Sequence, residues 1–211
     1  MALSTYSGLQ TSIITWAMRS GDTDFSAAVP DFIAMAESTF NYGSNDIEPI
    51  RCSEMETQAS ATLSSGEVEL PDDYLEYRQV WSDSTGQRIS LKFGTPTELY
   101  DSYSTTTGNP RRFTIIGDVL SVYPIGDGTI HMTYYAKIPA LSDSNTTNWL
   151  LTKAPNVYLY GSLLHAAPFM MDDQRIATWG QLYQNAVSGL KKSFLRHNYS
   201  RASIGVSGST P

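Results

Sequence analysis

The sequence has little charge and almost no cysteine. Asp, Glu, Lys and Arg make up 17% of the 211 residues, below the roughly 25% of an average globular protein. Residues with hydroxyl side chains are numerous instead: the chain has 26 Ser and 21 Thr. Such a composition is common where protein surface lies against other protein, and it also occurs in secreted β-rich proteins. The composition therefore fits both a protein whose surface is largely covered by other proteins and a secreted β-rich protein.

A single cysteine, Cys52, excludes an internal disulfide and a cysteine-based metal site. The N-terminal residues have neither a basic start nor a long apolar run, so we expect no signal peptide. No stretch reaches the roughly 18 apolar residues that a membrane span requires. We therefore expect a protein that folds in a reducing cytoplasm and has no membrane partner.

The net charge of -7 argues against a general nucleic-acid binder, because phosphate recognition needs a basic face. The charge is unevenly distributed: residues from Leu150 onward sum to +4, the first 149 residues to -11, and no acid follows Asp173. This asymmetry predicts a basic end that meets an acidic partner. A helix C-terminus that attracts cations would explain Lys191, Lys192 and Arg196 equally well.

Apolar residues at helical spacing predict two helices in residues 1–54. The first runs from Ser4 or Thr5 to Arg19. The second is capped by Thr23 or Asp24 and stops before Gly43, and we expect Pro30 in its first turn. From Thr57 the period changes to two, with glycine-containing turns between short strands. Residues 55–145 are therefore predicted to form an antiparallel β lobe, with a short helix opened by Pro96.

The helical period returns in residues 146–198. Pro155 is expected to open one helix and Pro168 to end it, and Asp172 or Asp173 caps the last one. Residues 199–211 have no core-forming pattern and read as a flexible docking tail. The predicted fold class is α+β, in which a four-helix bundle from the N- and C-terminal segments carries the inserted antiparallel β lobe.

No pattern in the chain predicts catalysis or metal binding. The three histidines are far apart, and the acidic pairs 72–73 and 172–173 are adjacent along the chain instead of opposed across a cleft. The segment Gly126-Asp127-Gly128 is a hairpin turn between strands and not a phosphate loop. We therefore expect no catalytic residues, no metal, no cofactor and no enzyme activity.

The 13 tyrosines are the remaining candidates for recognition, because an aromatic ring with a polar group suits interfaces. Those on the stripe of the last helix, such as Tyr183, are expected in the core. Tyr100, Tyr103 and Tyr158 are predicted to contact another chain, and Tyr199 is a further candidate.

Four stretches, in their order along the chain, resemble the head-to-tail adaptor (connector, or tail-tubular-A-like) proteins of tailed, notably short-tailed, bacteriophages. The motifs are Pro30 to Glu37, the Leu-Pro-x-Asp-Tyr-Leu run from Leu70 to Leu75, the strand exit from Tyr134 to Leu141, and Trp179-x-x-x-Tyr183. Together they span roughly residues 23 to 190.

This resemblance implies a virion protein of the neck or tail, assembled in the host cytoplasm. It implies a dodecameric homo-oligomeric ring, with the portal protein above and the tail nozzle or tube below. DNA would pass through the channel without specific binding, and an acidic wall would suit this passage because like charges repel.

The resemblance also implies that the C-terminal segment docks on the portal. We expect the segment from Lys191 to Pro211 to be loose in the free monomer and to order on the portal, with Arg196 and Arg201 pairing with portal acids. The predicted docking residues are Lys191, Lys192, Arg196, His197, Tyr199 and Arg201. The alternative is a small β-rich surface binding module, for glycans or a protein ligand, that presents exposed tyrosines.

Overall fold

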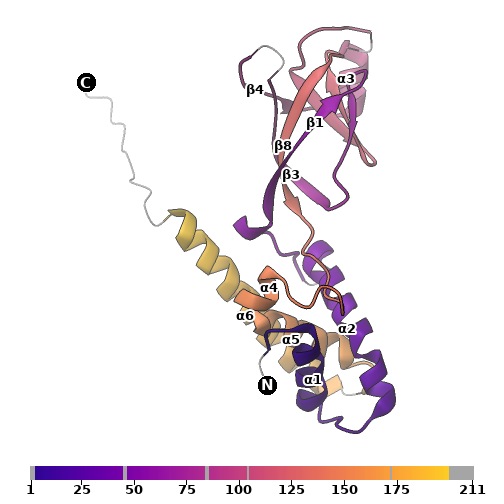
Figure 1. The fold of residues 1–211 in the computed structure, drawn as a ribbon, viewed down its shortest axis with the longest axis vertical. Helices are drawn as coiled ribbons and strands as arrows, with labels where there is room; N and C mark the ends of the chain where they lie inside the picture. Colours follow the sequence, from indigo (N-terminus) through magenta and orange to yellow (C-terminus); the bar gives the residue numbers. More distant parts are fainter. Residues whose placement is uncertain (1–2, 45–46, 84–85, 104, 172, 200–211) are drawn as a thin grey trace, which may run out of the picture. The chain divides into compact units, whose positions relative to one another are not determined.

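The computed structural model describes residues 3–44, 47–83, 86–103, 105–171 and 173–199. The chain divides into two compact units, which Figure 1 shows coloured along the sequence. Met1–Glu54 and Ile138–Pro211 form the first, here called the helical unit, and Met55–Lys137 form the second, here called the lobe. The mixed α+β class predicted from the sequence is confirmed.

The helical unit contains α1, α2, α4, α5 and α6. Their bounds are Tyr6–Trp16, Thr23–Tyr42, Trp149–Lys153, Pro155–Ala166 and Asp173–Tyr199. Side-chain caps fix several starts: Thr5 accepts from the Gly8 amide before α1, and Asp22 from the Phe25 amide before α2. Pro155 occupies the first turn of α5, where its missing N–H costs no helical hydrogen bond.

Two expectations about these helices are corrected. Pro30 lies inside α2 and not in its first turn, since the Asp22 cap starts the helix at Thr23. The four-helix bundle is not supported, because the described residues of this unit form five helices. The additional helix, α4, is a single short segment capped by Asn148, whose side chain accepts from the Leu151 amide at 2.9 Å.

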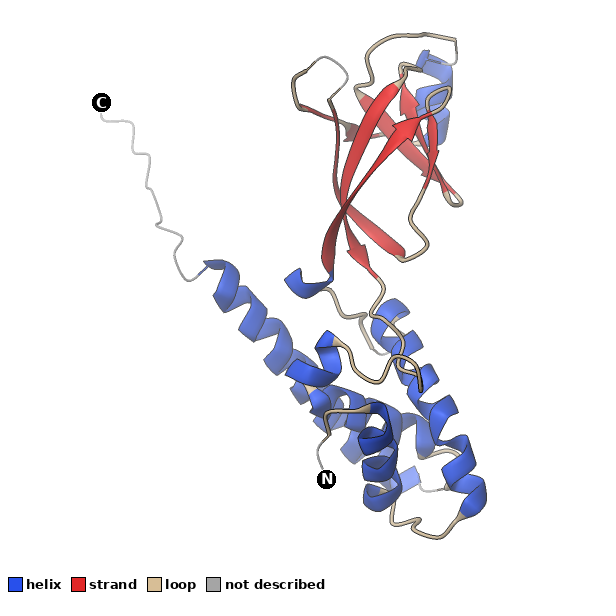
Figure 2. Ribbon diagram, viewed as in Figure 1, coloured by secondary structure: helices blue, strands red, loops and turns tan. Residues whose placement is uncertain are grey.

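The lobe consists of two four-stranded sheets and the helix α3, Pro96–Tyr103 (Figure 2). The first sheet has the order β1-β8-β3-β4, with bounds Glu56–Leu63, Gly128–Ala136, Tyr74–Ser82 and Ile89–Ser90. The second has the order β2-β7-β6-β5, with bounds Glu67–Glu69, Val119–Tyr123, Arg112–Ile116 and Lys92–Phe93. A 3-10 turn, Ser53–Met55, precedes β1.

The lobe is largely antiparallel, as expected, but β5 and β6 pair in parallel. β8 is the centre of the first sheet and pairs along its length with β1 and β3. The two sheets bury one apolar core between them, to which both contribute, for example Ile130 and Met132 from β8 and Phe113 and Leu120 from β6 and β7. The alternation seen in the sequence therefore reflects one inward face on each sheet.

The segment that follows β8 is fixed to α2 by side chains. The Ile138 amide donates to Asn41 Oδ1 at 3.0 Å, and the Leu141 amide donates to Glu37 Oε1 at 2.8 Å. These contacts group residues 138–145 with the helical unit, whereas the sequence pattern had placed them in the lobe. The β-like periodicity of the strand gave no sign of such side-chain partners.

Candidate functional site

The last helix, α6, is attached to the helical unit by one buried stripe. Trp179, Tyr183, Val187 and Leu190 lie on this stripe and are buried. The Tyr183 ring stacks on Phe40 of α2 with centroids 6.0 Å apart and an interplanar angle of 10°. Gly161 of α5 lies beside both rings, where an added Cβ would come within 2.8 Å of Phe40 Cε1. A glycine at this position therefore lets α5 approach the Phe40 and Tyr183 pair.

Two polar atoms on this stripe are left without a partner among the described residues. They are Trp179 Nε1 and the Tyr183 hydroxyl, both buried. Burial raises the pKa of Tyr183. A buried donor without an acceptor costs roughly 1–3 kcal/mol. These two groups therefore lower the stability that the packing of the stripe contributes.

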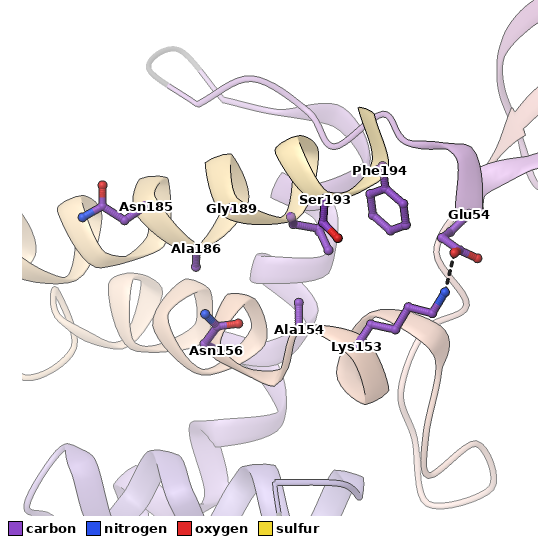
Figure 3. A pocket seen from close by; sticks show the side chains of 10 residues that line it. Glu54, Lys153, Ala154, Asn156, Asn185, Ala186, Gly189, Ser193 and Phe194 are labelled. Atoms are coloured by element: carbon purple, nitrogen blue, oxygen red, sulfur yellow. Dashed lines mark hydrogen bonds and ion pairs between the residues drawn. The ribbon is translucent and has the colours of Figure 1, made fainter. Parts of the chain in front are cut away.

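A groove of about 590 Å³ runs along one side of α6 (Figure 3). Its lining residues come from α6, from the α4–α5 junction and from the end of the N-terminal segment: Glu54, Lys153, Ala154, Asn156, Asn185, Ala186, Gly189, Leu190, Ser193 and Phe194. Lys153 forms an ion pair with Glu54 at one end, and its Nζ lies 5.9 Å from the Phe194 ring centroid. We call this surface the first α6 groove.

A second groove, of about 470 Å³, is formed by other residues of α6. It is lined by Ile47, Glu48, Tyr183, Gln184, Val187, Ser188, Lys191 and Lys192. Lys191 Nζ donates to Glu48 Oε2 at 3.3 Å, and the Lys192 side chain is exposed. We call this surface the second α6 groove. α6 thus contributes small residues such as Ala186 and Gly189 to the first groove, and Lys191 and Lys192 to the second.

The predicted docking residues lie at the end of the same helix. Lys191 and Lys192 border the second α6 groove. Arg196, His197 and Tyr199 fall within α6, but their side chains lie outside the described ones, and Arg201 lies outside the described residues altogether. The structure thus brings together the first two of the six. The expectation that the segment is loose from Lys191 onward is wrong as far as Tyr199, because α6 continues to that residue.

The predicted contact tyrosines have different environments. Tyr100, on α3, is 52% exposed, with its ring edge toward Tyr123 at 6.0 Å between centroids. Tyr103, at the end of α3, is half-buried. Tyr158 is 0% exposed, so it has no surface to offer another chain. Sequence spacing could not separate the three, because each lies on a helix with a mixed face.

Tyr158 instead belongs to a buried polar network that the sequence did not predict. Its hydroxyl donates to Glu37 Oε1 at 3.0 Å and accepts from Asn148 Nδ2 at 2.6 Å. Burial, followed by the Glu37 carboxylate, raises the pKa of Tyr158. Burial also raises the pKa of Glu37. The hydrogen bonds from the Leu141 amide and from Tyr158 lower it, but by less. The network joins α2, the segment after β8 and α5.

Residues from separate adaptor-like motifs meet through hydrogen bonds. Glu37, from the first motif, accepts from the amide of Leu141, at the end of the strand-exit motif. Within the lobe, the Tyr134 hydroxyl donates to Asp73 Oδ1 at 2.8 Å. Burial, then the Asp73 hydrogen bond, raises the pKa of Tyr134 to about 12. The motifs therefore mark structural attachments within each unit.

The histidines have structural partners where the structure describes their side chains. His165 Nε2 lies 3.0 Å from Thr39 Oγ1, and burial lowers the pKa of His165. His131 Nε2 lies 2.8 Å from Asp83 Oδ2, and the His131 ring stacks on the Trp81 ring. In the described ranges, no group of three His, Cys, Asp or Glu side chains could hold a metal ion. None of the helices within those ranges is both long and apolar enough to cross a membrane.

The chain thus has an α+β fold whose last helix borders two surface grooves, with Lys191 and Lys192 beside the second. A protein-family model described as SU10 adaptor protein matches residues 4–206. The chain belongs to this family of phage structural adaptor proteins, and it is therefore a virion component that interacts with other virion proteins. Among curated proteins, none matches the chain significantly.

Proposed function

We propose that this protein is a head-to-tail adaptor that assembles as a ring, expected to be dodecameric, between the portal and the tail nozzle or tube. Family membership supports the adaptor role. The observation that carries the docking side of the proposal is the cationic end of α6, where Lys191 and Lys192 border a groove and no acid follows Asp173 in the sequence. Such a surface fits an acidic partner.

In this proposal the segment from Lys191 to Pro211 docks on the portal. The stem of α6 holds the segment through the buried stripe. Lys191 exchanges its contact with Glu48, which is 89% exposed, for acids on the partner. Arg196, His197, Tyr199 and Arg201 complete the contact, and the residues after α6 order on binding. Tyr100 and Tyr103 are proposed contacts between neighbouring copies.

The ring surrounds the path of the DNA in this proposal. The chain is acidic overall, with a net charge of -7. An acidic wall repels phosphates, so DNA passes without being retained. Reversal of channel-lining acids is expected to slow ejection, and unchanged ejection would argue against this role of the charge.

The alternative of a surface binding module with exposed tyrosines has less support. The family is one of phage structural adaptors, which favours an assembly role over ligand binding. The two functions differ in solution: a binding module stays a monomer when a portal is added, whereas an adaptor assembles on it.

The first test is the mass of the purified full-length protein, alone and mixed with the portal protein of the same phage. We expect a ring-sized complex with the portal. The K191E/K192E variant should bind the portal at least about tenfold more weakly, because two attractive charges become repulsive. The matched control is K92E/R111E, which makes the same charge change at two exposed lobe residues. Equal loss in both variants would contradict docking through α6.

A second test removes residues 199–211. The truncated protein should keep the thermal unfolding transition of the full chain, because its helices and core are retained. It should no longer attach to the portal. Normal attachment of the truncated protein would refute the docking role of the C-terminal segment.

A further inference from the structure

The lobe has a seam between the edge strands of its two sheets, which the Ser64–Glu67 bridge closes at one end. β1 ends one sheet and β2 ends the other, and among the described strands each has one paired neighbour, β8 and β7 respectively. A cavity of about 340 Å³ lies between them. It is bordered by residues 59–61 of β1 and 68–72 of β2 and the following turn. We call this cavity the seam groove.

The floor of the seam groove is part of the apolar core. Leu120, Ile130 and Met132 line it, and each belongs to the buried core cluster of the lobe. Ala59 and Val68 are only partly buried against the same cluster. An aliphatic side chain placed in the groove would therefore extend the core.

One wall of the groove is an open strand edge. β1 has eight residues, and its pairing with β8 is continuous from Glu56 to Leu63. The strand carries no Pro and no Lys, two residues that commonly block edge pairing. An edge of this kind can accept an added strand through its main-chain groups.

The rim of the seam groove is acidic. Glu69 and Asp72 line it and are exposed. Lys137 lines the adjoining cavity, where its Nζ donates to the main-chain carbonyl of Asp72 at 2.8 Å, and within the described ranges neither carboxylate forms an ion pair. Glu67 lies at the other end of β2, where it lines the neighbouring cavity. An extended segment with aliphatic side chains on one side and a basic residue would complement this apolar floor and acidic rim.

The C-terminal sequence of this chain has that chemistry. Residues 201–206 read Arg-Ala-Ser-Ile-Gly-Val, so Ile204 and Val206 fall on one side of an extended strand, after Arg201. No acid follows Asp173 to oppose the rim. Twelve residues follow α6, and these could span roughly 40 Å when extended.

We propose that the seam groove of one copy binds residues 201–206 of a second copy as an added strand along β1. Ile204 and Val206 lie over the apolar floor, and Arg201 pairs with Glu69 or Asp72. A tail-to-lobe contact joins two different surfaces, and such contacts close into rings or extend into filaments. The proposal goes beyond portal docking because it concerns the free protein, where no portal competes for Arg201.

The test uses a labelled peptide of residues 199–211 and the full-length protein, diluted until its copies dissociate. We expect saturable binding, and at higher protein concentration excess unlabelled peptide should lower the mass of any multimer. The E69K/D72K variant should bind the peptide at least about tenfold more weakly, because an opposite-charge contact becomes repulsive. The control D101K/D127K makes the same charge change at two exposed lobe residues outside the groove and should bind within about twofold of wild type.

A second peptide tests the strand geometry. Exchange of Ser203 and Ile204 keeps composition and charge but breaks the alternation, so binding should fall at least about tenfold. In the wild-type protein, which needs no variant to fold, the bound peptide should slow amide exchange in β1.

The proposal is overturned by no peptide binding, by equal binding of the exchanged peptide, by equal effects of the two charge variants, or by unchanged amide exchange in β1. Loss of portal attachment with retained peptide binding would contradict the proposed function alone. Portal attachment without peptide binding would contradict the present inference alone.

Discussion

The helical unit and the lobe bury polar groups differently. In the helical unit, Glu37, Asn41 and Asn148 are buried and hydrogen-bonded to backbone or side chains of distant residues. In the lobe, the buried polar residues among those described are hydroxyl-bearing, as with Ser82, and Thr114 Oγ1 has no partner there.

Ser162 Oγ, Trp179 Nε1 and the Tyr183 hydroxyl of the helical unit also lack partners among the described residues. The two units therefore differ in the kind of polar group that they bury, since in the described parts of the chain only the helical unit buries side-chain amides and a carboxylate, and not in how fully these groups are paired.

The two units also expose different surfaces. Helices satisfy their backbone internally, so α6 can offer only side chains, in the two grooves along it. Sheets end in edges, so β1 and β2 offer main-chain groups beside an apolar floor. The two proposed docking surfaces therefore differ in kind, since the one on α6 would be recognised by charge and the one at β1 by strand addition.

The largest expected effect comes from truncation of a core ring in each unit. Phe40 is 0% and Phe113 1% exposed, so Phe40→Ala and Phe113→Ala should each cost about 3–5 kcal/mol of unfolding free energy. Hydrogen exchange should accelerate in α2, α5 and α6 for the first variant, and in β3, β6 and β8 for the second. Loss of protection in both units from either variant would show that they unfold as one.

Two glycines of the helical unit provide a narrower test. Gly161→Ala places a Cβ within 2.8 Å of the buried Phe40 ring, so we expect a loss of about 1–3 kcal/mol from overpacking. The matched control, Gly189→Ala, meets nothing within 4 Å and should gain about 0.5–1 kcal/mol from helix propensity. Urea unfolding midpoints measure both, and a loss at Gly189 equal to that at Gly161 would contradict the close approach.

Local signals explain how much of this fold could be predicted from the sequence. Thr5, Pro155 and Asp173 mark helix starts by their own chemistry, and the structure has helices beginning at or just after each. The glycine-containing turns lie between strands of the lobe as expected, because a residue's backbone freedom is a property of that residue. The hairpin predicted at Gly126-Asp127-Gly128 is wrong, because β7 and β8 belong to different sheets and do not pair. The division of eight strands into two sheets, and the parallel pair β5 and β6, depend on distant residues and left no local signal.

The candidate site was less predictable, because it too depends on residues that lie far apart in the sequence. Charge asymmetry directed attention to Lys191 and Lys192, which border a groove. The burial of Tyr158 depends on Glu37 and Asn148, which lie 121 and 10 residues away. Proline suits the first turn of a helix, which is why Pro30 is expected there, but the Asp22 cap starts α2 at Thr23 and leaves Pro30 in the helix interior.

Hydroxyl removal compares the two units directly. Tyr158→Phe removes a donor to buried Glu37 and an acceptor for Asn148, so about 1–3 kcal/mol should be lost. Tyr134→Phe removes a donor to Asp73, whose side chain is exposed. Water can replace that contact, so the loss should be nearer about 0.5–1 kcal/mol. Chemical denaturation measures both, and a larger loss at Tyr134 would reverse the contrast between the units.

The smallest effect is the pH dependence contributed by Glu37. Burial raises its pKa above the ordinary value of 4.5, so the folded state holds the proton more tightly than the unfolded state. The stability that protonation of Glu37 contributes is therefore fully present below about pH 4.5, and it is lost as the pH rises through the raised pKa of the folded state. In Glu37→Gln, which cannot ionise, this term is absent. The unfolding free energy of the wild type minus that of Glu37→Gln should thus decrease from pH 4 to pH 7 and then level off. A difference that rises over this interval would mean that the hydrogen bonds from Leu141 and Tyr158 outweigh burial, and that the carboxylate is stabilised as an anion within the helical unit.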